Sequence, residues 1–338
     1  PPQAIAIAMR GLNRFATILK DIEVTNVRAV ATAAVRDAKN GPKFVKQVEA
    51  LGLKVEVLSG EEEAITSAYG VIGAFPGATG VVADLGGGSL ELVAIGDGEA
   101  SHGVSLPLGT LRLPALRESG TKAFNKTIKG EMGRADWAKV HPGPLFMVGG
   151  TWRALAAYAM HKTKYPLTDP QGFTLSVAQA DKYAKKLAQM SPDKLSNIPG
   201  ISSNRAEGLP NAAAMLRPLM AALKPEGLVF SSWGLREGVL YRDLSDGAQK
   251  LDPLLAAISH FTEPRGASQT MAAQIAAWTS DAARSGTNGS ERLRLAAIML
   301  AQAQWRLEPN MRLKHSIDWA LDKRWLGITH KGRAMLAA

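Results

Sequence analysis

The stretch VVADLGGGSLELV, residues 81–93, constrains the fold of this chain more than any other. Val81–Ala83 is a short apolar run typical of a strand, Gly86–Ser89 is a glycine turn, and residues 90–95 again have strand character. The sequence therefore predicts a strand, a glycine turn and a second strand. A Walker loop and a dinucleotide-binding turn both require a helix directly after the glycines, so this pattern excludes them.

Two acidic residues flank the glycine turn, one on each predicted strand. Asp84 closes the first strand and Glu91 lies on the second. In this hairpin, the backbone N–H groups of Gly86, Gly87, Gly88 and Ser89 can face an anion while both carboxylates face the same pocket. Two carboxylates beside a phosphate cradle indicate a divalent cation between them. The alternative is a plain glycine-rich hairpin with one solvated acid on each strand.

The composition excludes several classes of protein. The 338 residues contain no cysteine, so disulfides and cysteine-ligated metals are absent, which fits a reducing compartment. No apolar run reaches the length of a membrane span, and the first residues do not have the pattern of a signal peptide. We expect a soluble, cytoplasmic protein of two or three domains.

The net charge of +10 indicates a polyanionic partner. The basic excess is concentrated in the last hundred residues. Nucleic acid, an acidic membrane and polyphosphate all carry suitable charge, and polyphosphate agrees best with the hairpin, so no nucleic acid or membrane is expected. A solvated basic face that only aids solubility is the alternative.

Apolar periodicity predicts alternating helices and strands before the hairpin, and hence a layered α/β fold with a mostly parallel sheet. Ser59 is a natural N-cap for the helix that starts in the acidic stretch GEEE, and Glu62 has the capping-box spacing. A helix N-terminus favours carboxylates whatever the function, so this acidic cluster has a purely structural explanation as well.

A second glycine turn follows the hairpin. Residues 145–148 read as a strand that enters Gly149, Gly150 and Thr151, and residues 152–161 read as a helix. This turn can offer N–H groups to an anion, although a tight strand-to-helix turn with no ligand is the commoner case. Residues 104–113 are predicted as a broken strand, and helices over 175–190 and 211–223 are separated by residues 197–210. From about residue 244 onward helical periodicity dominates.

Taken in order, these segments resemble the exopolyphosphatase and guanosine pentaphosphate phosphohydrolase family (Ppx/GppA). The resemblance covers almost the whole chain. It is carried by ATAAVRDA (31–38), LSGEEEA (58–64), VVADLGGGSLEL (81–92), SLPLGTLRL (105–113), VGGTWRAL (148–155), SSNRAEGLPNAA (202–213), WGLREGVLY (233–241) and the C-terminal stretch 315–337.

The resemblance implies an actin-like and sugar-kinase-like (ribonuclease H-like) fold of two α/β domains, followed by an all-helical domain. The expected limits are residues 1–75 for the remainder of the first domain, 76–244 for the second and 245–338 for the helical, HD-like domain. Relatives begin with a strand and a phosphate loop of the type D-x-G-S-N-S that this sequence lacks. We expect roughly sixty residues to precede Pro1 in such a fold.

The resemblance also implies roles for individual residues. Glu62 resembles the general base that activates a water, and Arg36 the cation that meets the terminal phosphate. Asp84 and Glu91 resemble carboxylates that hold Mg²⁺ (or Mn²⁺) and position the water. Phosphate contacts are expected from two glycine turns, made of Gly86, Gly87, Gly88, Ser89 and of Gly149, Gly150, Thr151.

The expected function is release of terminal phosphate from inorganic polyphosphate or guanosine pentaphosphate by a homodimer, within ppGpp metabolism. Two alternatives remain at this point, an ATP-dependent kinase of the same superfamily and an inactive protein that binds polyphosphate or alarmones. In longer relatives the C-terminal domain resembles a His-Asp phosphohydrolase bundle. Residues 301–305, AQAQW, stand where a His-Asp pair is expected, so this domain is predicted to be a basic docking surface.

Overall fold

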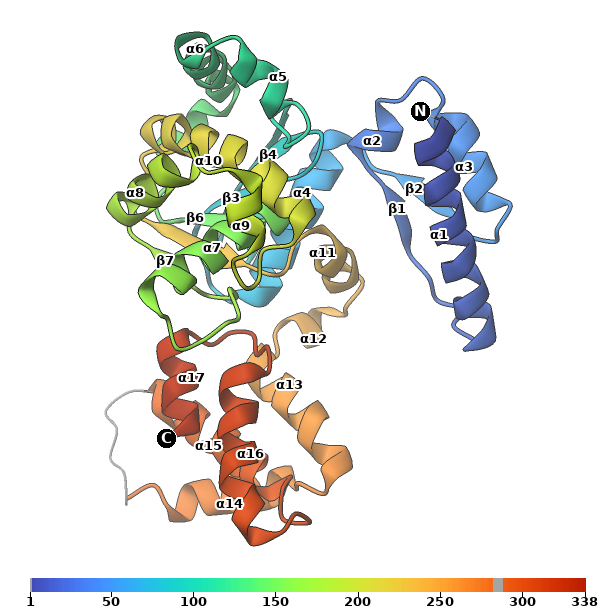
Figure 1. Ribbon diagram of the computed structural model, residues 1–338. Coiled ribbons are helices and arrows are strands. Elements are labelled where there is room, and N and C mark those ends of the chain that lie inside the picture. Colours follow the sequence, from blue (N-terminus) through green and yellow to red (C-terminus); the bar gives the residue numbers. More distant parts are fainter. Residues whose placement is uncertain (1, 282–287) are drawn as a thin grey trace.

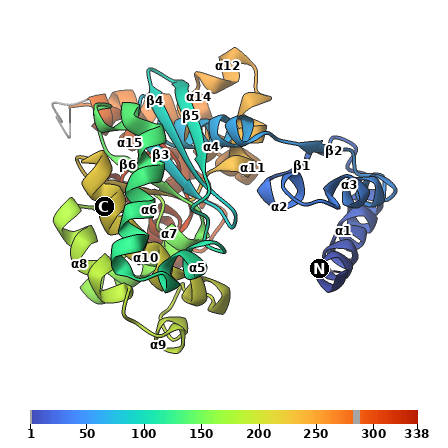
Figure 2. The same cartoon turned by 90° about the horizontal axis from the view of Figure 1, so that it is seen from above.

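The computed structural model describes residues 2–281 and 288–338. The chain forms a small N-terminal region, a central α/β domain and a C-terminal group of helices (Figure 1). The N-terminal region stands beside the central domain and connects to it through α2 and the start of α4, as the view from above also shows (Figure 2). The predicted fold class, α/β with an all-helical C-terminal part, is confirmed.

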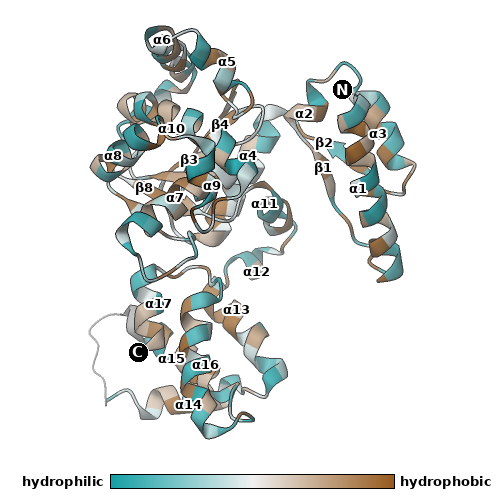
Figure 3. Cartoon of the chain, viewed as in Figure 1, coloured by the Kyte–Doolittle hydropathy of each residue, from teal (hydrophilic) through white to brown (hydrophobic). Residues whose placement is uncertain are grey.

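The N-terminal region consists of two parallel strands and their flanking helices. In chain order it contains α1 (Pro2–Asp21), β1 (Ala29–Ala31), α2 (Ala33–Arg36), α3 (Gly41–Glu49) and β2 (Val55–Val57). The strands pair in parallel, with Ala29 opposite Val55. Helix α1 has no buried residue, and its Ile7 and Phe15 are each more than half exposed. Figure 3 shows these apolar turns of α1 as brown bands. This region therefore has little core of its own.

The central domain is built on a six-stranded sheet. Its strands are β3 (Gly80–Leu85), β4 (Leu90–Gly96), β5 (Glu99–Leu106), β6 (Leu145–Val148), β7 (Thr174–Leu175) and β8 (Leu228–Ser231), in the order β5-β4-β3-β6-β8-β7. The β3/β6 and β6/β8 pairs are parallel and the other three are antiparallel. The prediction of a mostly parallel sheet is therefore wrong for this sheet, because the hairpin after β3 adds two antiparallel strands at one edge.

Helices cover both faces of this sheet. They are α4 (Gly60–Ala74), α5 (Leu113–Glu118), α6 (Thr121–Met132), the 3-10 helix η1 (Gly133–Lys139), α7 (Gly150–Thr163), α8 (Val177–Leu187), α9 (Pro192–Ser196), α10 (Ser203–Leu223) and α11 (Leu235–Arg242). On one face, α6, α7, α8 and α10 pack on the odd-numbered residues of β3, such as Val81 and Ala83. On the other face, α4 packs on Val82 of β3 and Val93 of β4. This alternation is the period of two expected of a strand buried on both faces.

Two predicted boundaries differ from the structure. Helix α4 shares a core with the six-stranded sheet, so the expected first-domain limit at residue 75 lies after a helix that packs with the second domain. The segment 197–210 was expected to separate two helices, but α10 already starts at Ser203 and continues through Pro210 and Pro218. Burial of its apolar face against α6, α7 and α8 outweighs the loss of backbone hydrogen bonds at the two prolines. The predicted broken strand over 104–113 is instead the end of β5 and a loop that leads into α5.

The C-terminal helices form a separate core. They are α12 (Asp246–Gln249), α13 (Pro253–Thr262), the 3-10 helix η2 (Glu263–Arg265), α14 (Gln269–Trp278), α15 (Asn288–Gln302), α16 (Pro309–Asp322) and α17 (His330–Ala337). Leu254, Ile258, Leu300 and Trp325 are buried at its centre. Among the described residues, no helix is both long enough and apolar enough to cross a membrane.

A buried ion pair fixes α17 to the central domain. Arg333 is fully buried and donates to Asp169 at 3.0 Å. His330 lies beside it and contacts the Tyr165 hydroxyl and the Gln171 carbonyl. The helical part is thus attached to the edge of the sheet that carries β7.

Candidate active site

Asp84 and Glu91 lie directly opposite each other at the turn end of β3 and β4. Opposite residues of an antiparallel pair point to the same face. That face is the one covered by α4, because Val82 and Val93, two residues from Asp84 and Glu91, belong to the same core as α4. The two carboxylates therefore lie side by side on the face of the hairpin that α4 covers.

Backbone hydrogen bonds from the loop that follows β5 fix the glycine turn. Gly86 N–H donates to the Ser89 carbonyl at 3.0 Å, and the carbonyls of Gly86 and Gly87 accept from Thr110 N and Leu111 N at 3.0 and 2.9 Å. Within residues 2–281 and 288–338, the amides of Gly87 and Gly88 have no acceptor. The Gly86 N–H, which was expected to face an anion, is thus used within the turn. The N–H groups of Gly87 and Gly88 remain free to donate to an anion.

Both carboxylates of the pair bind protons more tightly than usual. Burial raises the pKa of Asp84 to about 6, a shift that the Ser67 hydroxyl opposes by donating to it. Burial and the charge of Asp84 raise the pKa of Glu91 to about 8, although the Ser105 hydroxyl donates to it at 2.9 Å. Two adjacent carboxylates in a desolvated pocket repel each other unless a proton or a cation lies between them.

Glu63, and not Glu62, faces this pair. The Glu62 carboxylate accepts from Ser59 N at 2.8 Å while Ser59 Oγ accepts from Glu62 N at 3.1 Å, which completes a capping box at an exposed position. The side chain of Glu63 is only 13% exposed, and its charge raises the pKa of both Asp84 and Glu91. The structure therefore does not bring the predicted base into the site and places its neighbour there, because successive helix residues point about 100° apart.

Arg36 reaches the site from the N-terminal region. Its Nη1 lies 2.9 Å from Glu63 Oε2 and donates to the Leu58 carbonyl, and its Nε lies 3.3 Å from Asp37. No hydrogen bond joins its Nη2 to any described residue, which leaves that group for a ligand. The predicted cation is thus next to the acidic cluster, with Glu63 as its partner.

The second glycine turn lies beside Asp84. Gly149 has a φ of +111°, and a Cβ there would lie 2.6 Å from the Leu85 carbonyl and 3.4 Å from Asp84 Oδ1. Gly150 and the buried Thr151 then begin the 14-residue helix α7. The structure therefore brings Gly149 beside Asp84 and directs a helix N-terminus toward the pocket, a favourable place for an anion.

Two arginines that the sequence analysis missed also border this turn. A Cβ at Gly150 would overlap the guanidinium of Arg205, from α10. Arg153 is half-buried in the first turn of α7, where burial and the charge of Arg205 lower its pKa and Asp84 and Glu237 raise it. A cation in the first turn of a helix interacts unfavourably with the helix dipole. This unfavourable placement is the feature of the sequence that points to a functional role for Arg153. The site thus offers Arg36, Arg153 and Arg205 to phosphate oxygens.

The residues present fit a magnesium ion. The described residues contain no group of three or more His, Cys, Asp and Glu that could hold a metal alone. Mg²⁺ is commonly bound by one or two carboxylates, with water and substrate phosphate completing its shell. Asp84 and Glu91 supply two such carboxylates, and burial and mutual repulsion raise the pKa of both, an effect that a bound cation would offset.

Comparison with known proteins identifies the family of this chain. Residues 1–246 match the Ppx/GppA phosphatase family. The chain is 31% identical over 285 residues to retrograde regulation protein 2 of Saccharomyces cerevisiae, an alignment that covers 76% of this chain and 48% of that protein. It is 28% identical over 251 residues to guanosine-5'-triphosphate,3'-diphosphate pyrophosphatase of Vibrio cholerae, with 71% of this chain and 49% of that protein covered.

Solved structures show the same fold. A Ppx/GppA enzyme of Aquifex aeolicus superposes with a TM-score of 0.59 and 28% identity, over 71% of this chain and 82% of that one. An exopolyphosphatase of Cytophaga hutchinsonii superposes with a TM-score of 0.66 and 23% identity, with the same coverage. The chain spans about half the length of the curated relatives it matches. On the match over residues 1–246, the chain belongs to the Ppx/GppA phosphatase family.

Proposed function

We propose that this protein hydrolyses the terminal phosphoanhydride of inorganic polyphosphate or guanosine pentaphosphate. The observation that carries the proposal is the pairing of Asp84 with Glu91 beside the glycine turn, with Glu63 facing them. The names of the Vibrio and Cytophaga proteins support these substrate classes. Both substrates present the same terminal group to such a site.

In this reaction the chain's own residues bind the terminal phosphate and activate the attacking water. The terminal phosphate is bound and oriented by two kinds of donor. They are the backbone N–H groups of Gly87, Gly88 and the N-terminus of α7, and the guanidinium groups of Arg36, Arg153 and Arg205. Positioned donors of this kind stabilise the charge on the equatorial oxygens in the transition state. Little covalent work is required from the protein, because phosphoryl transfer depends mainly on alignment and charge.

Glu63 is the proposed general base. Its carboxylate pairs with Arg36 and its charge raises the pKa of Asp84 and Glu91, so it would accept a proton from a water aligned with the terminal phosphorus. Asp84 and Glu91 would hold Mg²⁺ or Mn²⁺, which supplies positive charge to the phosphate oxygens when bound. Ser67 and Ser105 fix the orientation of these carboxylates through their hydroxyl groups.

A second candidate function is a non-catalytic sensor of the same ligands. The yeast relative, which aligns over more of this chain than the Vibrio protein does, is named as a regulation protein. A sensor would bind polyphosphate or guanosine pentaphosphate and release no phosphate.

Phosphate release by the full chain separates the two candidates. We expect release from polyphosphate or guanosine pentaphosphate in the presence of Mg²⁺, and a loss of about 10²-fold or more in Asp84→Asn. Asp318→Asn, which removes an acid from an exposed pair on α16, is the matched control and should keep its activity. Tight binding of either substrate without release would establish the sensor instead.

A further inference from the structure

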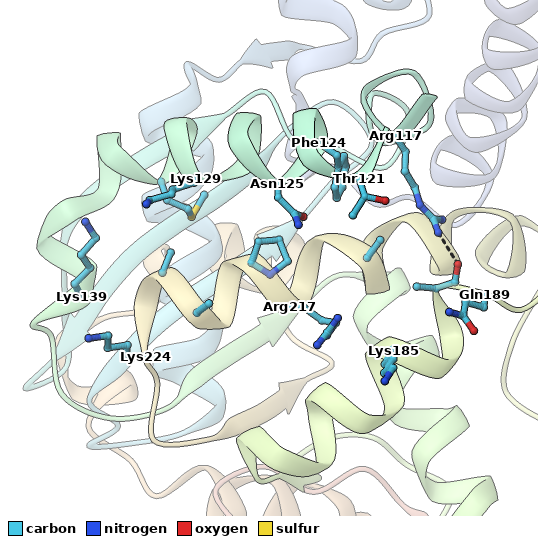
Figure 4. A pocket seen from close by; sticks show the side chains of 16 residues that line it. Arg117, Thr121, Phe124, Asn125, Lys129, Lys139, Lys185, Gln189, Arg217 and Lys224 are labelled. Carbon is cyan, nitrogen blue, oxygen red and sulfur yellow. Dashed lines mark hydrogen bonds between the residues drawn. The ribbon is translucent and has the colours of Figure 1, made fainter. Parts of the chain in front are cut away.

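A large groove lies on the outer surface of the central domain, away from the acidic pair. It has a volume of about 930 Å³ and runs along α10 between α6 and α8 (Figure 4). Its α10 residues, 214–222, belong to the C-terminal half of that helix, whereas Arg205, at the active site, lies in the first turn. Twelve residues separate Arg205 from Arg217, which corresponds to about 18 Å along a helix. The groove is therefore distinct from the active site.

The charged side chains of the groove are all positive. They are Arg117, Lys129, Lys139, Lys185, Arg217 and Lys224, and no carboxylate among the described residues lines the groove. Figure 4 shows them around its rim, where α5, α6, η1, α8 and α10 with its C-cap contribute them. Clefts lined by charges of one sign concentrate the electrostatic field and attract ions of the opposite sign.

Most of this charge is not neutralised within the protein. Arg217 is paired with Asp181 at 2.6 Å and Lys139 with Asp136. In contrast, Lys129, Lys185 and Lys224 form no ion pair with any residue that the structure describes. Arg117 is half-buried and donates at 2.6 Å to the Ala188 carbonyl and at 2.9 Å to the Asn211 side-chain oxygen, both uncharged. A half-buried guanidinium without a carboxylate is costly, so an anionic ligand would relieve it.

The walls between these cations are apolar. Phe124 and Met132 from α6 face Ala214, Pro218 and Ala222 from α10, and Phe124 and Met132 are almost fully buried. The volume lies in the range of small-molecule sites, which combine apolar walls with a few charged groups. An inorganic phosphate chain has no apolar part to match these walls.

We propose that this groove is a second ligand site, which takes a nucleoside polyphosphate. The phosphates would contact the lysines and arginines of the rim, while the nucleoside would occupy the space against the apolar wall of α6 and α10. Helix α10 would then connect this site with the active site, since its first turn holds Arg205 against Gly150.

Binding of GTP and ATP to the full chain tests the proposal by calorimetry at about 0.15 M ionic strength. All variants carry Glu63→Gln, so that the nucleotides stay intact if the parent hydrolyses them. The experiment measures binding and therefore does not depend on the proposed activity. We expect at least one of the two nucleotides to bind the groove. The double variant Lys185→Glu/Lys224→Glu should weaken the binding of that nucleotide at one site by about 10-fold or more. The matched control, Lys186→Glu/Lys194→Glu, changes the same charge at exposed lysines outside the groove and should bind within about 2-fold of the parent.

Two further measurements locate the ligand and define its class. Hydrogen exchange should show that nucleotide protects residues 121–132 and 212–224, in addition to any protection of the active-site segments 84–91 and 148–153. Inorganic tripolyphosphate should bind the groove at least about 10-fold more weakly than the nucleotide, because it lacks the apolar part. The proposal is wrong if protection is confined to the active-site segments, if both double variants behave alike, or if tripolyphosphate binds the groove as tightly as nucleotide.

Discussion

The Arg36 guanidinium lies 2.9 Å from the Glu63 carboxylate and joins the N-terminal region to helix α4. Arg36 is the last residue of α2, whose first residue, Ala33, lies close to Gly88 of the glycine turn. This ion pair therefore brings a base and a cation from two parts of the chain to the edge of one pocket. The position of Glu63 in that pocket is the feature on which the proposed chemistry most depends.

Replacing Glu63 and Glu62 in turn distinguishes the base from the cap. We expect Glu63→Gln to lower phosphate release about 10²- to 10⁴-fold, the usual contribution of a positioned base. Glu62→Gln should leave release within about 2-fold of the parent, because glutamine at this position can still complete a capping box with Ser59. Steady-state release of phosphate measures both. Equal losses in the two variants would contradict the assignment of Glu63.

The stability of the metal-free protein should fall as the pH rises from about 4.5 to about 8. The pKa of Glu91 is raised from its ordinary value to about 8, so between these limits the folded state binds a proton that the unfolded state has released. The free energy of unfolding therefore decreases with pH in this window. Glu91→Gln removes the part of this dependence between about pH 6 and 8, since Asp84, whose pKa is raised to about 6, contributes only below that range. The variant should stabilise the metal-free protein at pH 8 by on the order of 1–3 kcal/mol.

Thermal unfolding across this pH range, without divalent cation, measures the effect. Glu118→Gln, at an exposed position on α5, is the matched control and should keep the slope of the parent. Mg²⁺ should stabilise the parent more at pH 8 than at pH 6, because it competes with the proton for the pair. A flat profile for the metal-free parent would mean that Glu91 is ionised without a partner.

Gly109 should not tolerate a side chain. A Cβ at this position would overlap the backbone of Gly87, Gly88 and Ser89, so Gly109→Ala must displace the glycine turn. We expect a destabilisation of about 1–3 kcal/mol, typical of overpacking, and a loss of phosphate release larger than the stability change explains. Gly130→Ala on α6 is the control, since its Cβ would meet nothing within 4 Å, and it should be neutral or stabilising. Chemical denaturation and phosphate release measure the two effects.

Removing the buried partner of Arg333 should weaken the attachment of the helical part. Asp169 accepts from both Arg333 and Arg324, and Asp169→Asn would leave the fully buried guanidinium without a countercharge. We expect a loss of about 3–5 kcal/mol, as for other broken buried pairs. Lys314→Gln, which breaks an exposed pair with Asp318, should cost about 0–1 kcal/mol. Limited proteolysis between residues 244 and 253 should become faster in Asp169→Asn alone.

Several features of this protein follow from local sequence patterns. The hairpin at residues 81–95, the strand and turn that lead into α7, and the helical last third were all predicted from runs of about five to fifteen residues. Such runs contain their own periodicity, glycine punctuation and caps, so the local structure depends little on the rest of the chain. The order of motifs along the chain also identified the family.

Other features required the tertiary structure, because they depend on which surfaces meet. Glu62 and Glu63 are neighbours in sequence and equally acidic, and only the packing of α4 on the sheet decides that Glu63 faces the pocket. Arg205 is more than fifty residues from Gly150 in the sequence, and no local pattern predicts that α10 brings the two together. The cationic groove likewise combines charges from α5, α6, η1, α8 and α10, and none of these helices stands out by its own charge. The sequence by itself thus determined the elements and the acidic pair, while the packing of helices on the sheet decided which charges surround that pair.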